Sequence, residues 1–376
     1  MPCQPCVAEN HPCGRVICAA VYRLDERELP NEIYEILTFY AVSDPDPEEE
    51  TWKMRTGGGQ PYHGGDPHSA GINSVRGGAA NAIARLLFRD ITRWPHLEVA
   101  VRALTVDKSL AVRSVAIDCL LALMNRDRAF SIGLFLKLVD GAEEILGCRS
   151  SDSFLHHAVY SHYVNVRDVL LQMLKAPQEN ARATAARQIT IAAFHNEKAA
   201  EDLQQAINGD EHCREAIASV FAYNLGNEPV RVQCRSQIIQ FFNDDSQKVR
   251  KTADNCFRNL SPDQLAEEQD LIFDFIKSRA FDEGFEQLVF TLNESTALLP
   301  DVICAIPERV VAKHVQEMPT ESIDQRRPVF GLSEIVIRLY EQTKDSSVKT
   351  RCLNVIDSLL QLGMGTLEGE LNKIER

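Results

Sequence analysis

The sequence has no apolar run approaching the ~18 uninterrupted residues that a membrane-spanning helix requires. Its start, MPCQPCVAENHPCGR, lacks the basic and then apolar stretches of a secretory signal. Basic residues are also in deficit, at 40 against 54 acidic residues, which gives a net charge of −14. Proteins that bind nucleic-acid phosphates usually carry a basic surplus or stripe. These absences predict a cytoplasmic protein without membrane contact, and they disfavour nucleic acid as a partner.

The eleven cysteines are an odd number spread along the chain. Most lie among apolar residues of expected helices, where a free thiol behaves as a small buried hydrophobe. A disulfide framework is typical of a short secreted chain, so the pattern favours the reducing cytoplasm. Cys3, Cys6, Cys13 and Cys18 with His11 leave a zinc knuckle open as an alternative, although we favour a frayed tail that leads into a helix.

Convincing alternating strand patterns are absent, whereas an internal repeat of helical character is present. One pattern recurs along the chain: a small or β-branched residue is followed by Arg or Lys and then by apolar residues at helical spacing. The best copies are SVRGGAANAIARLLF, AVRSVAIDCLLALM, ARATAARQITIAAF, CREAIASVFAYNL, PVRVQCRSQIIQFF, KVRKTADNCFRNL and SVKTRCLNVIDSLLQL. Their basic residues are Arg76, Arg113, Arg182, Arg214, Arg231, Arg250 and Lys349.

These basic residues are separated by 37, 69, 32, 17, 19 and 99 positions. The separations lie near multiples and half-multiples of roughly 34–38 residues, a period typical of two-helix repeats. One helix pair cannot cover its own apolar face, so neighbouring pairs must stack. The sequence therefore predicts an all-α fold, an α-solenoid of stacked antiparallel helix pairs.

Two copies of the repeat resemble HEAT repeats: AVRSVAIDCLLALM, preceded by Asp107, and KVRKTADNCFRNL, preceded by Asp244 and Asp245. In that family an Asp lies near the turn and Val-Arg follows in the second helix. The resemblance covers roughly 72–260 and 344–362. It implies that the basic residues pair with acidic or backbone groups of an adjacent repeat, as an inner ladder. The predicted ladder residues are Arg76, Arg113, Arg182, Arg231 and Arg250.

The predicted organisation has three parts. Residues 1–50 form an N-terminal helical segment with a cysteine-containing tail. Residues 51–71 form one long glycine-rich loop. HEAT-like repeats fill 72–376 and are irregular at about 262–343.

The stretch GGGQPYHGGDPHSAGINSVRGG, residues 57–78, holds 8 of the 19 glycines. Gly59 and Gly64 have the spacing of a phosphate-binding loop. However, Gly65 and Asp66 follow where such a loop needs Lys and Ser or Thr, and a carboxylate would repel phosphate. We therefore expect a connector, with partner binding as the alternative, rather than a nucleotide site.

The candidate partner-binding residues are Tyr62, His63, Asp66 and His68, because they are specific groups on a long excursion from the helices. The last three could also ligate zinc, but no helical i, i+4 pair fixes them and the glycines make preorganisation costly. We predict no metal and no cofactor.

A second cluster contains His156, His157, Tyr160, His162 and Tyr163. On a helix, His156 and Tyr160 share a face, while His157 lies nearer the apolar side. Asp152 is the only acidic neighbour at helical distance, and no nucleophile pairs with these imidazoles. The cluster therefore predicts a polar face or groove lining, and no catalytic residue is predicted.

These observations favour a non-catalytic scaffold or a regulatory module that binds a protein partner. More weakly, the chain resembles the C-terminal helical portion of large bacterial NTPase proteins, some linked to phage defence. This resemblance rests on the order of segments from GGDPHSAGINSVRGGAANAIARLL to SLLQLGMGTLEGEL. That resemblance implies an NTPase or effector subunit as partner. The alternative is an enzyme on a HEAT scaffold, either bilin lyase-like or DNA glycosylase-like, and the net charge argues against the second.

Overall fold

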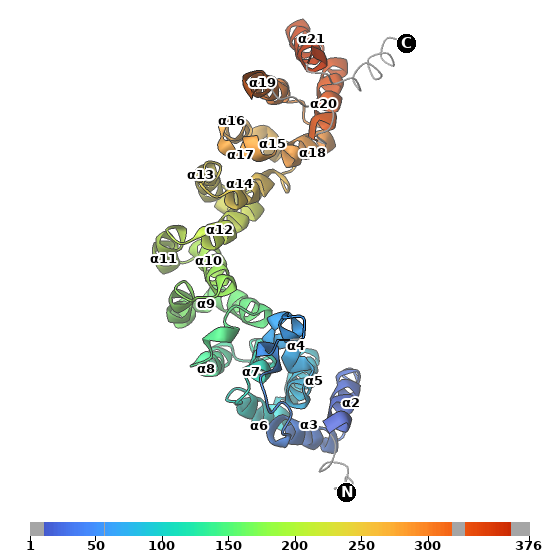
Figure 1. Cartoon of the computed structure of the whole chain (residues 1–376), viewed down its shortest axis with the longest axis vertical. Coiled ribbons are helices and arrows are strands. Elements are labelled where there is room, and N and C mark those ends of the chain that lie inside the picture. The colour runs from blue at the N-terminus through green and yellow to red at the C-terminus, as the bar shows by residue number, and fades with distance from the viewer. Residues whose placement is uncertain (1–10, 56, 318–327, 362–376) are drawn as a thin grey trace. The chain divides into compact units, whose positions relative to one another are not determined.

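The computed structural model describes residues 11–55, 57–317 and 328–361 (Figure 1). In these ranges the chain is built from helices and has no β-strand; Arg55 and Pro61 form one isolated bridge. The predicted all-α class is confirmed. The chain divides into two compact units, Met1–Arg214 and Glu215–Arg376, which we call unit 1 and unit 2. None of the described helices is long and apolar enough to span a bilayer.

The helices of unit 1 alternate with short turns. The α-helices are α2 (His11–Tyr22), α3 (Asn31–Ser43), α4 (Pro67–Ile72), α5 (Val75–Arg89), α6 (Trp94–Leu104), α7 (Leu110–Leu123), α8 (Arg128–Val139), α9 (Arg149–Met173), α10 (Glu179–Ala193) and α11 (Glu197–Ile207). The 3₁₀ helices are η1 (Thr51–Lys53), η2 (Tyr62–Gly65), η3 (Ile91–Arg93) and η4 (Glu143–Ile145). Helix α12 (Glu211–Asn224) contains the division between the units.

Unit 2 contains shorter helices in its first half. Its α-helices are α13 (Arg231–Phe241), α14 (Gln247–Asp254), α15 (Pro262–Glu267), α16 (Gln269–Lys277), α17 (Arg279–Glu283), α18 (Glu286–Glu294), α19 (Pro300–Glu317), α20 (Pro328–Gln342) and α21 (Ser346–Gln361). The 3₁₀ helices are η5 (Glu228–Val230) and η6 (Asn255–Phe257).

Helices α5, α7, α9 and α10 of unit 1 pack side by side in chain order, and α6, α8 and α11 pack against them (Figure 1). Ser109 caps the start of helix α7, and its hydroxyl accepts the N–H of Val112. Ten of its fourteen residues are buried, because neighbouring helices cover it on several sides. The small residues of α5 allow α7 to approach its backbone closely. The Cys119 thiol of α7 lies 3.2 Å from the Ala80 carbonyl oxygen of α5.

The repeated arginine occupies the fourth position of four helices, α7, α10, α12 and α14. Arg113 Nε donates to the carbonyl of Asp107, six residues before it, at 2.6 Å. Arg182 and Arg250 make the same six-residue contact at 2.7 and 2.6 Å, and Arg214 reaches five residues back at 2.8 Å. Each guanidinium thus satisfies carbonyls of the turn before its helix, which would otherwise lack partners.

Four of the repeat arginines, Arg76, Arg182, Arg231 and Arg250, also contact carboxylates 28 to 36 residues further along the chain. Arg113 differs, because it donates to backbone carbonyls of Leu138 and Asp140 at 3.3 and 3.4 Å. Successive pairs are therefore joined by guanidinium contacts as well as by apolar packing. The carboxylate pairs are Arg76 with Asp107, Arg182 with Asp210, Arg231 with Glu267, and Arg250 with Glu283.

The acidic run DPDPEEE, residues 44–50, caps two helices. The Asp46 carboxylate accepts the N–H of Val75 at 2.6 Å, at the start of α5. The Glu50 carboxylate accepts the N–H groups of Leu110 and Ala111 at the start of α7. Carboxylates are favourable at helix N-termini because unpaired N–H groups and the helix dipole are positive there. The run therefore ties residues 44–50 to the helix layer of α5 and α7.

Candidate functional site

The described residues from Thr51 to Ile72, which cover the predicted glycine-rich loop at 51–71, fold against α5 and α7. The segment begins with helix η1 and ends with helices η2 and α4. Between them, the bridge between Arg55 and Pro61 brings the two sides of a short loop together. The N–H of Tyr62 donates to the Met54 carbonyl at 2.8 Å. Helix α4 contacts η1, η2, α5 and α7. We call the excursion, residues 52–65, the recognition loop.

The first end of the recognition loop is fixed by side chains. The indole N–H of Trp52 donates to Glu50 at 2.7 Å, and Glu50 in turn caps α7. The ammonium group of Lys53 lies 2.8 Å from the Glu144 carboxylate of the turn after α8. These contacts hold the loop entrance to two helical elements.

The second end is fixed by helix α4. The Asp66 carboxylate caps this helix by accepting the N–H groups of His68 and Ser69 at 3.2 and 3.0 Å and the Ser69 hydroxyl at 2.6 Å. Burial opposes ionisation of Asp66, but the hydrogen bonds from Ser69 and His68 outweigh it and hold its pKa below the ordinary value. Asp66 is therefore a charged helix cap.

His68 points from α4 to α7. Its Nε2 lies 2.9 Å from the Asp118 carboxylate, and the two side chains are 28% and 25% exposed. The hydrogen bond to Asp118 raises the pKa of His68, against the opposing effect of burial. A Cβ added to Gly71 would lie 2.2 Å from the Ala111 carbonyl oxygen, so the backbones of α4 and α7 are in direct contact.

The structure separates the four predicted partner-binding residues into two groups. Asp66 and His68 are engaged in contacts within the chain. Tyr62 is 46% exposed, His63 is exposed, and their rings pack edge to face with centroids 4.3 Å apart. His63 adopts φ +51°, an uncommon conformation for a residue other than glycine. Met54, 42% exposed, also belongs to the loop, and sequence reasoning missed it because no motif marks it.

The histidine cluster on α9 is largely as expected. The rings of His156 and Tyr160 share a face, with centroids 5.2 Å apart. His157 is exposed, so its expected position nearer the apolar side is wrong. Burial and the neighbouring His157 lower the pKa of His156. Tyr163 is buried and donates its hydroxyl hydrogen to Asp202 at 2.8 Å, a partner 39 residues away that helical spacing could not indicate.

The described cysteines are free thiols, and all except Cys13 are buried. Burial raises the pKa of Cys18, Cys234 and Cys304 to about 12 in each case. These thiols therefore stay protonated near neutral pH and act as packing residues. Cys3 and Cys6 of the zinc alternative lie outside the described residues. Within the described ranges, no three His, Cys, Asp or Glu side chains are grouped so that they could hold a metal ion.

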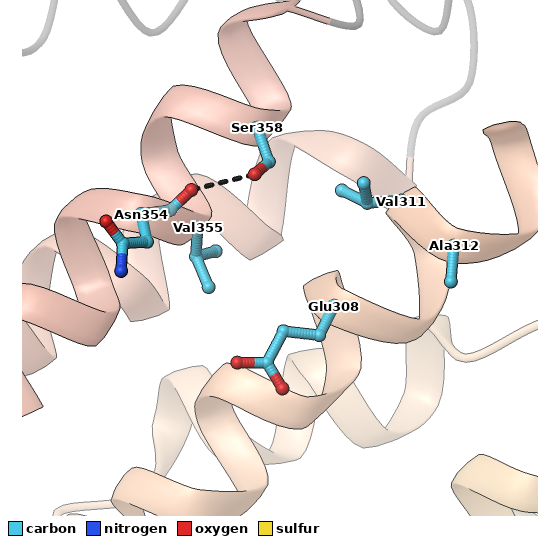
Figure 2. A pocket seen from close by; sticks show the side chains of 6 residues that line it. All are labelled: Glu308, Val311, Ala312, Asn354, Val355 and Ser358. Atoms are coloured by element: carbon cyan, nitrogen blue, oxygen red, sulfur yellow. Dashed lines mark hydrogen bonds between the residues drawn. The ribbon is translucent and has the colours of Figure 1, made fainter.

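A small pocket of about 220 Å³ lies between α19 and α21 of unit 2 (Figure 2). Val311, Ala312 and Val355 supply its apolar lining. The Glu308 carboxylate at its edge is held by Arg351 at 2.8 and 2.9 Å, so its charge is already compensated. The pocket offers room for one apolar side chain but no charged group free to select a ligand.

Asp254 of unit 2 gives a pH-dependent prediction. Burial, and secondarily the charge of Glu286, raise its pKa to about 8. The native state then keeps a proton that the unfolded chain releases above its ordinary value of 3.8, so stability falls as pH rises from about 4 to about 8. We expect the melting temperature of unit 2 in Asp254→Asn, measured relative to the parent, to be higher at pH 8.5 than at pH 5.5. This relative melting temperature should change by about 3 °C or more between the two pH values.

Calorimetry at the two pH values measures this difference, with Asp263→Asn as the control because Asp263 is exposed. The same pH dependence in the parent and in Asp254→Asn would contradict the assignment.

No family model matches the sequence, and no curated protein matches it either. The HEAT and NTPase-region resemblances therefore stay predictions.

Proposed function

We propose that this chain is a non-catalytic interaction module that binds a protein partner through the recognition loop, residues 52–65. The observation that carries the proposal is the exposure of Met54, Tyr62 and His63 on a loop with both ends fixed. Large side chains presented on a held backbone lose little conformational entropy when they bind. Tyrosine is also enriched among the residues that dominate binding energy.

The charge of the recognition loop supports a partner with an acidic surface. Residues 51–65 contain Lys53 and Arg55 and no acidic residue, although the whole chain carries −14. Glu144 neutralises Lys53, whereas Arg55 is exposed and makes no ion pair within the described residues. A carboxylate on the partner would complement Arg55 while an apolar group packs on Tyr62. By the resemblance given above, we propose an NTPase or effector subunit of a bacterial assembly as this partner.

Partner capture from native lysate tests the proposal. We expect Tyr62→Ala combined with His63→Asn to reduce recovery of the partner at least tenfold, because exposed aromatic anchors contribute more than ~1.4 kcal/mol. Asparagine tolerates the backbone conformation of His63, and Asp66 is left intact because it caps α4. Phe290→Ala, which removes an exposed aromatic ring in unit 2, is the matched control. Equal recovery of the partner with the parent, the double variant and Phe290→Ala would contradict the proposal.

A further inference from the structure

Helix α4 lies between the recognition loop and α7, and it packs on α7. It has six residues, of which Pro67, Ala70 and Gly71 are buried. A helix this short is not stable by itself and depends on its docking. Asp66 belongs to both elements, since it caps α4 and directly follows η2. Loss of α4 docking would therefore also free the second end of the loop.

Within the described part of the chain, helix α4 makes a single ion pair, the one between His68 and Asp118. Both side chains are partly exposed, so His68 can exchange its proton with solvent without unfolding of the unit. The contact is an ion pair when His68 is protonated; when His68 is neutral, its ring N–H can still donate to the carboxylate, but the attraction between opposite charges is lost. A partly exposed ion pair contributes up to about 1 kcal/mol beyond what the pair without opposite charges contributes.

We propose that protonation of His68 regulates how firmly α4 is docked on α7, and thereby how rigidly the recognition loop presents Tyr62 and His63. The regulation of binding rests on the proposed function, whereas the docking equilibrium itself does not. In mildly acidic solution α4 is held and the loop is ordered for binding. In mildly alkaline solution α4 opens more often and the loop loses its second anchor.

The groups that act on His68 come from three elements. Asp118 of α7 and Asp66 of the α4 cap favour the protonated imidazole, and Arg149 at the start of α9 opposes it. Lys53 of η1, which also contacts α4, is paired with Glu144. Because the two carboxylates dominate, the docked state has the higher affinity for the proton, and the pKa of His68 lies above the ordinary 6.5. The stabilisation is therefore complete below about 6.5 and is lost as pH rises through the raised value.

Hydrogen exchange of the intact chain, followed on peptides that cover residues 66–72, tests the inference. At each pH the exchange rate of a variant is divided by that of the parent, which cancels the pH dependence of the exchange chemistry. We expect Asp118→Asn to accelerate exchange of α4 about fivefold at pH 6, and by less than twofold at pH 8.5. Since the attraction between opposite charges in a partly exposed pair contributes up to about 1 kcal/mol, a fivefold change is the size anticipated.

His68→Gln is the second variant, because glutamine can donate to Asp118 without carrying a charge, and it should also accelerate exchange mainly at pH 6. His63→Asn is the control, since that exposed imidazole has no carboxylate partner within the described residues and asparagine tolerates its backbone conformation. Variant-to-parent ratios that do not change with pH in Asp118→Asn and His68→Gln would overturn the inference.

The exchange experiment is independent of partner capture. If α4 exchange follows pH as expected but Tyr62→Ala with His63→Asn leaves capture unchanged, the proton-dependent docking stands and the proposed function fails. If capture is lost in that double variant but the exchange ratios are flat, the recognition loop binds and the regulation by His68 fails.

Discussion

Gly77→Ala is expected to destabilise unit 1 by about 3 kcal/mol, the upper range for overpacking against backbone. A Cβ at position 77 would lie 2.0 Å from the Gly71 carbonyl oxygen and 3.0 Å from the Ser74 hydroxyl. The first obstacle is backbone, which cannot rotate away. The Gly71 backbone is itself pressed against Ala111 of α7, so α4 cannot move in that direction to make room. The clash therefore also disturbs the packing of α4 on α7.

Urea unfolding followed by tryptophan fluorescence measures this effect. Both tryptophans, Trp52 and Trp94, belong to unit 1, so the signal reports on that unit alone. Gly133→Ala is the matched control, because Gly133 is an exposed position of α8 with no atom within 4 Å of an added Cβ. Alanine there should stabilise the helix by about 0.5–1 kcal/mol. Equal midpoints for the two variants would contradict the close backbone contact.

Arg76→Met is expected to cost about 3–5 kcal/mol, the range for removing one partner of a buried ion pair. Arg76 is 3% exposed. Its guanidinium donates to Asp107 at 2.8 and 3.2 Å and to the carbonyls of Asp44 and Pro47 at 2.7 and 2.9 Å. Methionine fills similar volume but leaves a buried carboxylate and two carbonyls without these donors.

The control for Arg76 is Arg89→Met. Arg89 lies in the same helix and pairs with Glu26 at 3.0 Å, but both side chains are more than half exposed. Exposed pairs contribute little, so the free energy of unfolding should change by less than about 0.5 kcal/mol. The same urea experiment measures both variants. A loss for Arg76→Met as small as that for Arg89→Met would show that the buried contact does not join the helix pairs.

The helical class could be predicted because its cause is local. Apolar spacing in copies such as AVRSVAIDCLLALM fixes the buried face, and caps such as Ser109 fix where helices begin. The constant position of Arg113, Arg182 and Arg250 was also visible, since each acts on carbonyls within six residues.

The candidate site could be predicted only in part, because it depends on contacts between residues distant in sequence. His68 and Asp118 are 50 residues apart, and nothing in either neighbourhood indicates the pairing. Composition made 51–71 look like one connector, although Pro67–Ile72 is a helix that Asp66 caps and α7 covers. Likewise, nothing near the acidic run at 44–50 indicates that Asp46 and Glu50 cap helices that begin 29 and 60 residues later.

Site-specific photo-crosslinking in cells measures partner binding most directly. A photoreactive amino acid placed at Tyr62 lies in the recognition loop, and one placed at the exposed Val99 of α6 lies outside it. We expect position 62 to yield one crosslinked protein of constant mass, and position 99 to yield none of that mass. The same crosslinked protein from both positions, or none from position 62, would contradict recognition by this loop.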